Sequence, residues 1–209
     1  MPLQNRVDPK GQLHAVTSRG MFMGNKGHLH NDTKQIVRNF SWNGWIICAL
    51  QHQGIKRELM AVGEYTELFF LDEATALSAG HRPCGYCLRE KYNEFKKTWI
   101  GANCEDESQN VNMTDINKIN QKERYHRGSK VTFVERMDSL PNGAFIEFEL
   151  NFYLIYQGAK YLWSFDGYTE KSALSDDNVT VLTPKTFISV LANGYEPIYH
   201  DSLKAIVNE

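Results

Sequence analysis

Two cysteines three positions apart are the residues whose types and spacing best support a chemical role. Cys84 and Cys87 stand in the segment GHRPCGYC at positions 80–87. A tight turn between them lets both sulfur atoms face one cation and directs backbone N–H groups at them, which favours the thiolate. We expect Cys87 to lie in the first turn of a helix, whose positive end also lowers a thiol pKa. The pair predicts part of a tetrahedral zinc site.

Two other interpretations of this pair stay open. One is a redox-active dithiol, and the other is two buried cysteines without a shared role. A redox C-x-x-C usually follows a strand in a βαβ unit. Here the pattern predicts a helix and a glycine before the pair. Metal binding is therefore the favoured interpretation.

A tetrahedral site needs further ligands, and the chain offers several sulfur and imidazole donors. We favour His30 and Cys48 together with Cys84 and Cys87. His30 belongs to the loop GNKGHLHND, where His28 and His30 would point in opposite directions if the loop is extended. Cys48 ends an apolar run, and its alternative role is that of a small core residue. The remaining candidates are His28, His52, His81, Cys104, His126 and His200.

The run YTELFFLDEATALSAGHRPCGYC at positions 65–87 resembles the second half of the zinc-binding domain of the Ada adaptive-response DNA repair proteins. That pattern is a strand, a short Ala-rich helix, Gly-aromatic-Arg-Pro-Cys-x-x-Cys and a second helix, and here it covers residues 65–100. The resemblance implies that Cys84 and Cys87 bind zinc. It disfavours His81, because an aromatic residue that binds no metal fills that place.

One departure from the Ada pattern matters for function. Ada domains take their other two ligands from an upstream C-x-x-x-C, one cysteine of which accepts the methyl group. The corresponding stretch, around residues 54–59, contains no cysteine. The resemblance therefore does not imply phosphotriester repair, and the missing ligands must come from elsewhere.

The chain as a whole also resembles a family of uncharacterised bacterial proteins. The shared features are the start MPLQNRV, the segment Met23–Asn25, and the regions 182–184 and 194–195. This second resemblance implies no particular activity.

Composition places the chain among ordinary globular proteins. Of its 209 residues, 42% are hydrophobic and 23% are charged. No apolar run is long enough for a membrane span, and the N-terminus lacks the features of a signal peptide. Four cysteines, two of them in the C-x-x-C, do not suggest a disulfide framework. We expect a cytoplasmic protein.

Charge is distributed unevenly along the chain. Residues 1–100 carry 13 Lys and Arg against 9 Asp and Glu, whereas residues 101–209 carry 10 against 16. A polyanion would therefore meet the N-terminal half. Basic residues around the cysteine pair suggest weak nucleic-acid binding, and the alternative is a solvated helix face interleaved with acidic residues. The candidates are Arg82, Arg89, Lys91, Lys96 and Lys97.

The element pattern predicts an α+β fold: a small zinc-bearing α/β N-terminal half and a β-rich C-terminal half. Residues 1–101 form the Ada-like metal-binding region, 102–123 a polar connector, and 124–209 a β-rich region with a terminal helix. Strands are expected at 42–50, 57–62, 66–71, 131–136, 145–150, 152–156, 161–165 and 179–182. Helices are expected at 73–79, 85–100, 114–123 and after Thr183-Pro184. Asp72 is the expected cap of the first helix and Thr183 that of the last. Leu88, Tyr92, Phe95 and Trp99 recur on one face of the second helix, and Gln157-Gly158 is expected to form a turn.

Two classes of function follow from these residues. The favoured one is a zinc-binding, nucleic-acid-associated binding or accessory factor. The alternative is a hydrolase or lyase acting on nucleic acid or a small molecule, using a His-lined metal site or Pro2. Once Met1 is removed, Pro2 would carry a free secondary amine that can form an iminium. The sequence contains no Walker loop, Rossmann fingerprint or H-E-x-x-H. A metal with an open, water-bearing position would indicate the enzyme, and a closed four-ligand set the structural role.

Overall fold

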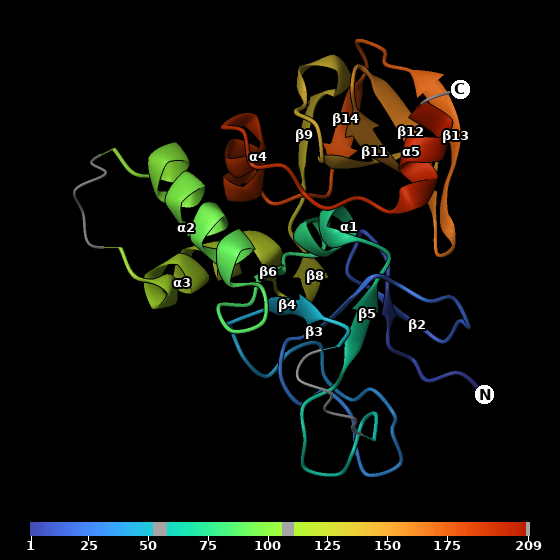
Figure 1. Ribbon diagram of the computed structural model, residues 1–209, viewed down its shortest axis with the longest axis vertical. Helices are drawn as coiled ribbons and strands as arrows, with labels where there is room; N and C mark the ends of the chain where they lie inside the picture. The colour runs from blue at the N-terminus through green and yellow to red at the C-terminus, as the bar shows by residue number, and fades with distance from the viewer. Residues whose placement is uncertain (52–57, 106–110, 208–209) are drawn as a thin grey trace.

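The chain adopts an α+β fold in which helices and two larger sheets surround a short central helix (Figure 1). The computed structural model describes residues 1–51, 58–105 and 111–207. No helix in these ranges combines the length and the apolar composition that crossing a lipid bilayer requires.

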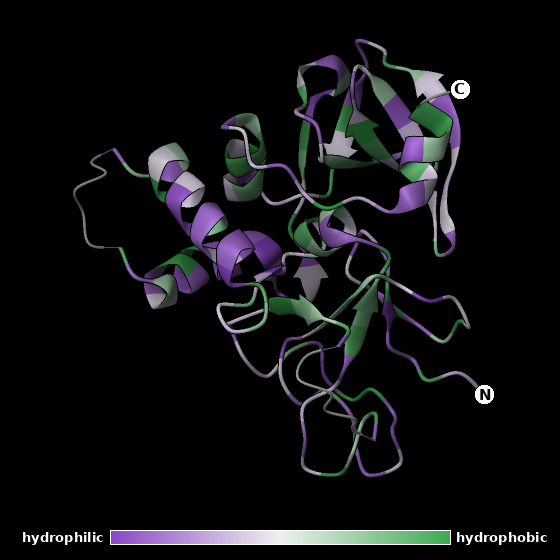
Figure 2. Cartoon of the chain, viewed as in Figure 1, coloured by the Kyte–Doolittle hydropathy of each residue, from purple (hydrophilic) through white to green (hydrophobic). Residues whose placement is uncertain are grey.

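The N-terminal half is built on a mixed sheet with strand order β2-β1-β5-β3-β4-β6. Its central strands carry alternating buried side chains, and β4 and β5 stand out as hydrophobic in Figure 2. The core of this half includes Ile47, Leu68 and Phe70, which are all fully buried. The strands are β1 (Arg6–Val7), β2 (Leu13–His14), β3 (Phe22–Asn25), β4 (Ile46–Ala49), β5 (Leu68–Phe70) and β6 (Arg82–Pro83).

The C-terminal half holds an antiparallel sheet with strand order β13-β12-β11-β10-β14-β9. A tight turn joins β11 to β12, where Gln157 and Gly158 both have positive φ, as the expected Gln-Gly turn requires. A small hairpin, β7 (Tyr125–His126) and β8 (Ser129–Lys130), precedes the sheet. The sheet strands are β9 (Phe133–Arg136), β10 (Phe145–Phe148), β11 (Asn151–Tyr156), β12 (Ala159–Ser164), β13 (Gly167–Ala173) and β14 (Asn178–Val181).

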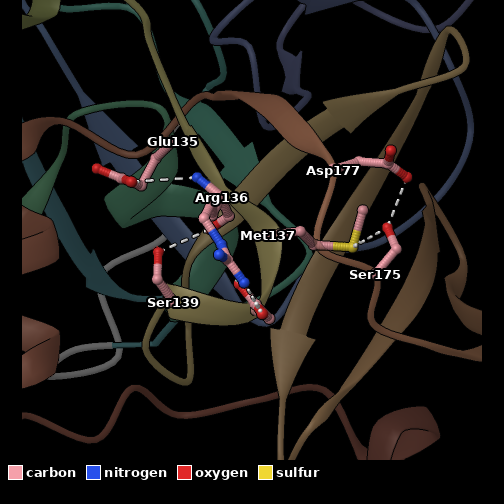
Figure 3. Close-up of polar contacts among 7 residues, drawn as sticks. Glu135, Arg136, Met137, Ser139, Ser175 and Asp177 are labelled. Atoms are coloured by element: carbon pink, nitrogen blue, oxygen red, sulfur yellow. Dashed lines mark hydrogen bonds and ion pairs between the residues drawn. The ribbon is translucent and has the colours of Figure 1, made fainter.

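Several polar contacts surround the C-terminal end of the edge strand β9 (Figure 3). Arg136 pairs with Asp138 at 2.6 Å as the chain enters a 3₁₀ turn, Met137–Ser139. On the neighbouring segment, the Ser175 hydroxyl donates to the Asp177 carboxylate at 2.8 Å. Exposed charges on an edge strand disfavour pairing with a second sheet, so this edge is protected.

Helix α1 (Glu73–Ser78) is buried along its whole length and connects three hydrophobic clusters. Ala74 packs in the cluster of the C-terminal sheet, Ala76 in that of the N-terminal sheet, and Leu77 in a helical cluster. As expected, Asp72 caps the helix by accepting from the Thr75 N–H at 2.8 Å. The other helices are α2 (Arg89–Asn103), α3 (Met113–Arg124), α4 (Lys185–Ala192) and α5 (Asp201–Val207).

Several expected elements differ from those observed. Residues 58–62 of the expected strand 57–62 form turns, because Met60 has a φ of 52° that an extended strand does not allow, while Arg57 lies outside the described residues. Thr183 does not cap α4; its hydroxyl accepts from the Phe145 N–H instead. Strand β13 and helix α5 were not expected at all.

The expected division of the chain at residues 101 and 123 stays a prediction. Helix α3 occupies residues 113–124 and buries Ile116 in the helical cluster with Trp99 of α2 and Phe187 of α4. That part of the expected polar connector is therefore a packed helix.

Candidate metal centre

Three cysteines meet at the edge of the N-terminal sheet. Cys48 lies on β4, and Cys84 directly follows β6, which runs parallel to β4 with Ile47 opposite Pro83. The ladder continues one step further, because the Cys84 N–H donates to the Ile47 carbonyl at 2.9 Å. The parallel register therefore sets Cys48 beside Cys84. A non-local strand pair, and not sequence spacing, brings these two thiols together.

Cys87 completes the group from the turn at residues 85–87. The three sulfur atoms all lie within 4.8 Å of one another. A tetrahedral zinc ion with Zn–S bonds of about 2.3 Å holds its sulfur ligands roughly 3.8 Å apart. All three side chains are half-buried. The cluster is thus close to the geometry that a metal ion needs and could hold one.

Hydrogen bonds favour the negatively charged thiolate form of one cysteine of the cluster, Cys84. A side-chain hydrogen bond from Cys48, helped by the backbone N–H groups of Tyr86 and Cys87, lowers the pKa of Cys84 to about 5. The Tyr86 N–H lies 3.4 Å from the Cys84 sulfur. The same bond, together with burial, raises the pKa of Cys48. Burial also raises the pKa of Cys87, against the opposing effect of the Ala49 N–H. A cation would replace the protons that two of these thiols retain.

The local structure of the cysteine pair corrects two expectations. Helix α2 begins at Arg89 with Leu88 as its N-cap, so Cys87 lies in the turn before the helix and not in its first turn. The pair also follows the short strand β6, where a helix and glycine alone were expected. The backbone N–H groups that lower the pKa of Cys84 belong to Tyr86 and Cys87, in the turn before the helix.

The thiols border a pocket of about 420 Å³ on this face of the sheet. Its walls are largely apolar, with Met23, Ile46 and Phe69 beside the cysteines. Glu67 also lines it, but one carboxylate oxygen accepts from the Met60 N–H at 2.8 Å. The pocket is large enough for a small molecule to approach a metal ion held by the cluster.

His30 lies elsewhere. Its buried ring contacts the Thr66 hydroxyl at 2.6 Å through Nδ1 and the Ala61 carbonyl at 3.2 Å through Nε2. No histidine joins the three cysteines in the part of the chain that the structure describes. The rings of His28 and His30 do not point in opposite directions, as they would in an extended loop, because their centroids are 4.7 Å apart. The ring of His30 fixes its own loop instead.

The other candidate ligands lie away from the three cysteines or fall outside the described residues. His81 is buried between Trp45 and Phe70, with ring centroids at 5.2 and 4.7 Å. His200 contacts the Ser202 hydroxyl at 2.8 Å. Neither histidine joins the three cysteines. Cys104 packs against the helical hydrophobic cluster, and His126 is exposed, so these two residues do not join the cysteines either. His52 lies outside the described residues.

The five basic residues do not form one exposed row. Arg82 is buried, and its guanidinium donates to Asn117 at 3.1 Å and to the Pro83 carbonyl at 2.9 Å, so it is not placed for a surface contact. Lys91 donates to Glu94 and to the Glu196 carbonyl. The remaining three lie on α2, where Arg89 and Lys97 are exposed and Lys96 is half-buried.

Comparison of the chain with models of protein families, with curated proteins and with solved structures gave no match. Functional conclusions therefore rest on the geometry of the chain itself. Among the groups that the described residues form, the three-cysteine cluster is the arrangement suited to holding a metal ion.

Proposed function

We propose that this protein is a zinc protein whose ion is held by Cys48, Cys84 and Cys87. The observation that carries the proposal is the approach of the three sulfur atoms to within 4.8 Å. A redox dithiol needs two thiols, whereas a third thiol supplied by a separate strand is what a metal needs. Soft thiolates with tetrahedral spacing favour zinc among the common divalent ions. The ion would fasten β4 to the turn before α2.

We further propose that this zinc protein associates weakly with nucleic acid. Its support is the Ada-like segment 65–87 and the basic side chains of Arg89, Lys96 and Lys97 on α2. A metal bound at the preceding turn would fix the start of this helix. Only a few phosphate contacts are available, so the expected affinity is that of non-specific binding, roughly 10⁻⁴–10⁻⁶ M.

The pocket beside the thiols favours a second candidate, a metal-dependent hydrolase or lyase. A ligand in the 420 Å³ pocket would reach an ion held by the cluster. Water at an open coordination position would supply the nucleophile. The iminium route through Pro2 is a separate version of this candidate, supported by the exposure of Pro2, and borohydride trapping tests it.

Metal analysis of paired variants tests the zinc proposal. We expect about one zinc ion per chain in freshly purified, unchelated protein. Cys48→Ser should lose most of this metal, whereas Cys104→Ser should keep it, because Cys104 is a cysteine of the same chain that lies outside the cluster. Protein without a transition metal, or equal metal content in the two variants, would contradict the proposal.

Cobalt substitution separates the structural role from the catalytic one. The visible spectrum of tetrahedral Co²⁺ bound to thiolates changes when an added ligand enters its coordination shell. Azide or imidazole should leave the spectrum unchanged if four protein ligands close the site. A saturable spectral change would instead indicate an open position and support the enzyme.

A further inference from the structure

Four cationic side chains help to line a second cavity, of about 560 Å³. It lies across β3 and β4 from the thiol pocket: Asn25 and Ile46 line the thiol pocket, while their neighbours Lys26 and Trp45 line this cavity. Successive side chains of a strand point to opposite faces, so the sheet separates the two sites. The cations are Lys10, Lys26, Arg124 and Lys130.

Arg124 is the most deeply buried of these cations. Only 2% of its surface is exposed at the end of α3. One guanidinium nitrogen donates to the Asn43 carbonyl at 2.9 Å, and the guanidinium carbon lies 5.3 Å from the centre of a Trp45 ring. Gly80 leaves space for the aliphatic part of the Arg124 side chain, since a Cβ at position 80 would lie 2.8 Å from the Arg124 Cγ. The packing fixes this charge at the cavity wall.

The hairpin β7–β8 returns Lys130 to the side of Arg124. Tyr125 pairs with Lys130 in the hairpin, and the Val131 N–H donates to the Arg124 carbonyl at 3.2 Å. The Lys130 ammonium turns inward and donates to the Ser78 carbonyl at 2.6 Å. Lys26, only 5% exposed, approaches from the N-terminal sheet and lies 4.7 Å from a Trp45 ring centre. Lys26 of the N-terminal sheet thus meets Arg124 and Lys130, which lie close together around the hairpin β7–β8.

The acidic residues nearby are engaged with other partners. Glu147 pairs with Lys10 at 2.8 Å, and Asp8 pairs with His14 at 2.8 Å. Glu123 accepts from the N–H and the hydroxyl of Thr186. Within residues 1–51, 58–105 and 111–207, no carboxylate forms an ion pair with Lys26, Arg124 or Lys130.

Two residues that line the cavity, Arg124 and Trp45, contain buried hydrogen-bond donors without a partner in the part of the chain that the structure describes. The Nε and one terminal nitrogen of Arg124, and the indole Nε1 of Trp45, are buried without a hydrogen-bond partner among the described residues. Leaving a buried donor unpaired costs about 1–3 kcal/mol, and more for a charged one. A ligand that satisfies these groups must bring several acceptor oxygens and negative charge.

We propose that this cavity binds a phosphate group. A tetrahedral dianion offers acceptor oxygens to the fork of Arg124 and to the ammonium groups of Lys26 and Lys130. The cavity volume falls within the range of small-molecule sites, so the group can be free inorganic phosphate or the monoester of a small metabolite.

The electrostatics of the free cavity agree with this assignment. Burial is the main cause that lowers the pKa of Lys130 to about 7, that of Lys26 to about 8 and that of Arg124 to about 9. Neighbouring cations add to the lowering of the pKa of Lys130 and Arg124, whereas the charge of Asp8 opposes it for both lysines and that of Glu123 opposes it for Arg124. A bound dianion would offset this cost and draw protons onto the lysines. A bound anion would therefore increase the positive charge on Lys26 and Lys130 and so strengthen its own attraction to them.

Titration calorimetry on the metal-loaded full-length protein tests the proposal with sodium phosphate, ribose 5-phosphate and sodium sulfate at constant ionic strength. The variants are Arg124→Leu, Lys130→Met and, as a control at an exposed lysine of β13 outside the cavity, Lys171→Met. Because Arg124→Leu removes a buried side chain, circular dichroism establishes its folding, and the half-buried Lys130 provides a second, less disruptive variant. We expect Lys130→Met to weaken phosphate binding at least tenfold and Lys171→Met to leave it unchanged.

The two sources of phosphate are distinguished by the ligand series. Tighter binding of ribose 5-phosphate than of phosphate assigns the site to a monoester, and equal binding assigns it to the free anion. Absence of saturable binding by any of these anions would overturn the proposal, as would affinities that are the same in Lys130→Met and Lys171→Met. The outcome is independent of the thiol site, which all the variants retain.

Discussion

Replacing His81 with a residue that cannot ionise should remove part of the protein's sensitivity to mild acid. The His81 ring is fully buried between Trp45 and Phe70. Burial, followed by the nearby charges of Lys26 and Arg124, holds the pKa of His81 well below its ordinary value. The native state therefore keeps this ring neutral at a pH where the unfolded chain protonates it.

The sign and the size of the effect follow from proton linkage. An unfolded histidine titrates near pH 6.5, so below that pH the unfolded state binds one more proton than the native state. The free energy of unfolding consequently falls as the pH falls, by up to about 1.4 kcal/mol per pH unit. Between pH 7.5 and pH 5.5 this single residue should reduce the free energy of unfolding by about 1.4 kcal/mol.

Urea denaturation of the wild type, His81→Phe and His81→Gln at the two pH values measures this contribution. Each replacement shifts stability by some amount at pH 7.5, and only the change in that shift with pH is diagnostic. Relative to the wild type, both variants should gain about 1.4 kcal/mol on going to pH 5.5. His126→Gln, at an exposed ring, is the matched control and should show no such gain. A stability difference that stays constant between the two pH values would refute the reasoning.

Three further predictions concern the metal, the glycine beside Arg124 and nucleic acid. Chelation should lower the unfolding temperature of the wild type, measured by circular dichroism, and should have little effect on Cys48→Ser, because metal-binding free energy contributes to folding; equal shifts would contradict a folded-state metal site. Gly80→Ala should cost about 1–3 kcal/mol in urea denaturation, since φ is 86° and the added Cβ would meet the Arg124 stem; an unchanged midpoint would show that the stem moves aside freely. Fluorescence anisotropy with labelled oligonucleotides should show weak binding that falls steeply with salt and is reduced in Lys96→Glu/Lys97→Glu; binding that is absent at low salt or unaffected by these changes would remove the nucleic-acid proposal.

Elements with strong local signals were predicted correctly from the sequence. Asp72 followed by an Ala-rich stretch predicts the capped helix α1, and Gln157-Gly158 predicts the turn between two strands. The spacing of Phe95 and Trp99 predicts the buried face of α2. These features depend on the conformational preferences of a few neighbouring residues, which the sequence displays directly.

Elements that depend on distant partners were harder to predict. The apolar composition of residues 58–62 suggested a strand, but Met60 N–H binds the Glu67 carboxylate and the chain turns there. Strand β13 (Gly167–Ala173) has a polar sequence with little alternation, and its pairing with β12 defines it. Sheet pairing can override weak local preferences in this way.

The sequence by itself determined that Cys84 and Cys87 form a compact pair on a turn, because three-residue spacing around glycine is a local constraint. Only the tertiary structure decided what joins them: parallel pairing of β4 with β6 brings in Cys48, while hydrogen bonds to Thr66 and Ala61 hold His30 in another place. The cation-lined cavity is likewise a product of the fold, since Lys26, Arg124 and Lys130 have no common motif. The physical reason is that spacing along a chain fixes geometry over a few residues, whereas contacts between distant segments follow from how the whole chain buries its apolar surface.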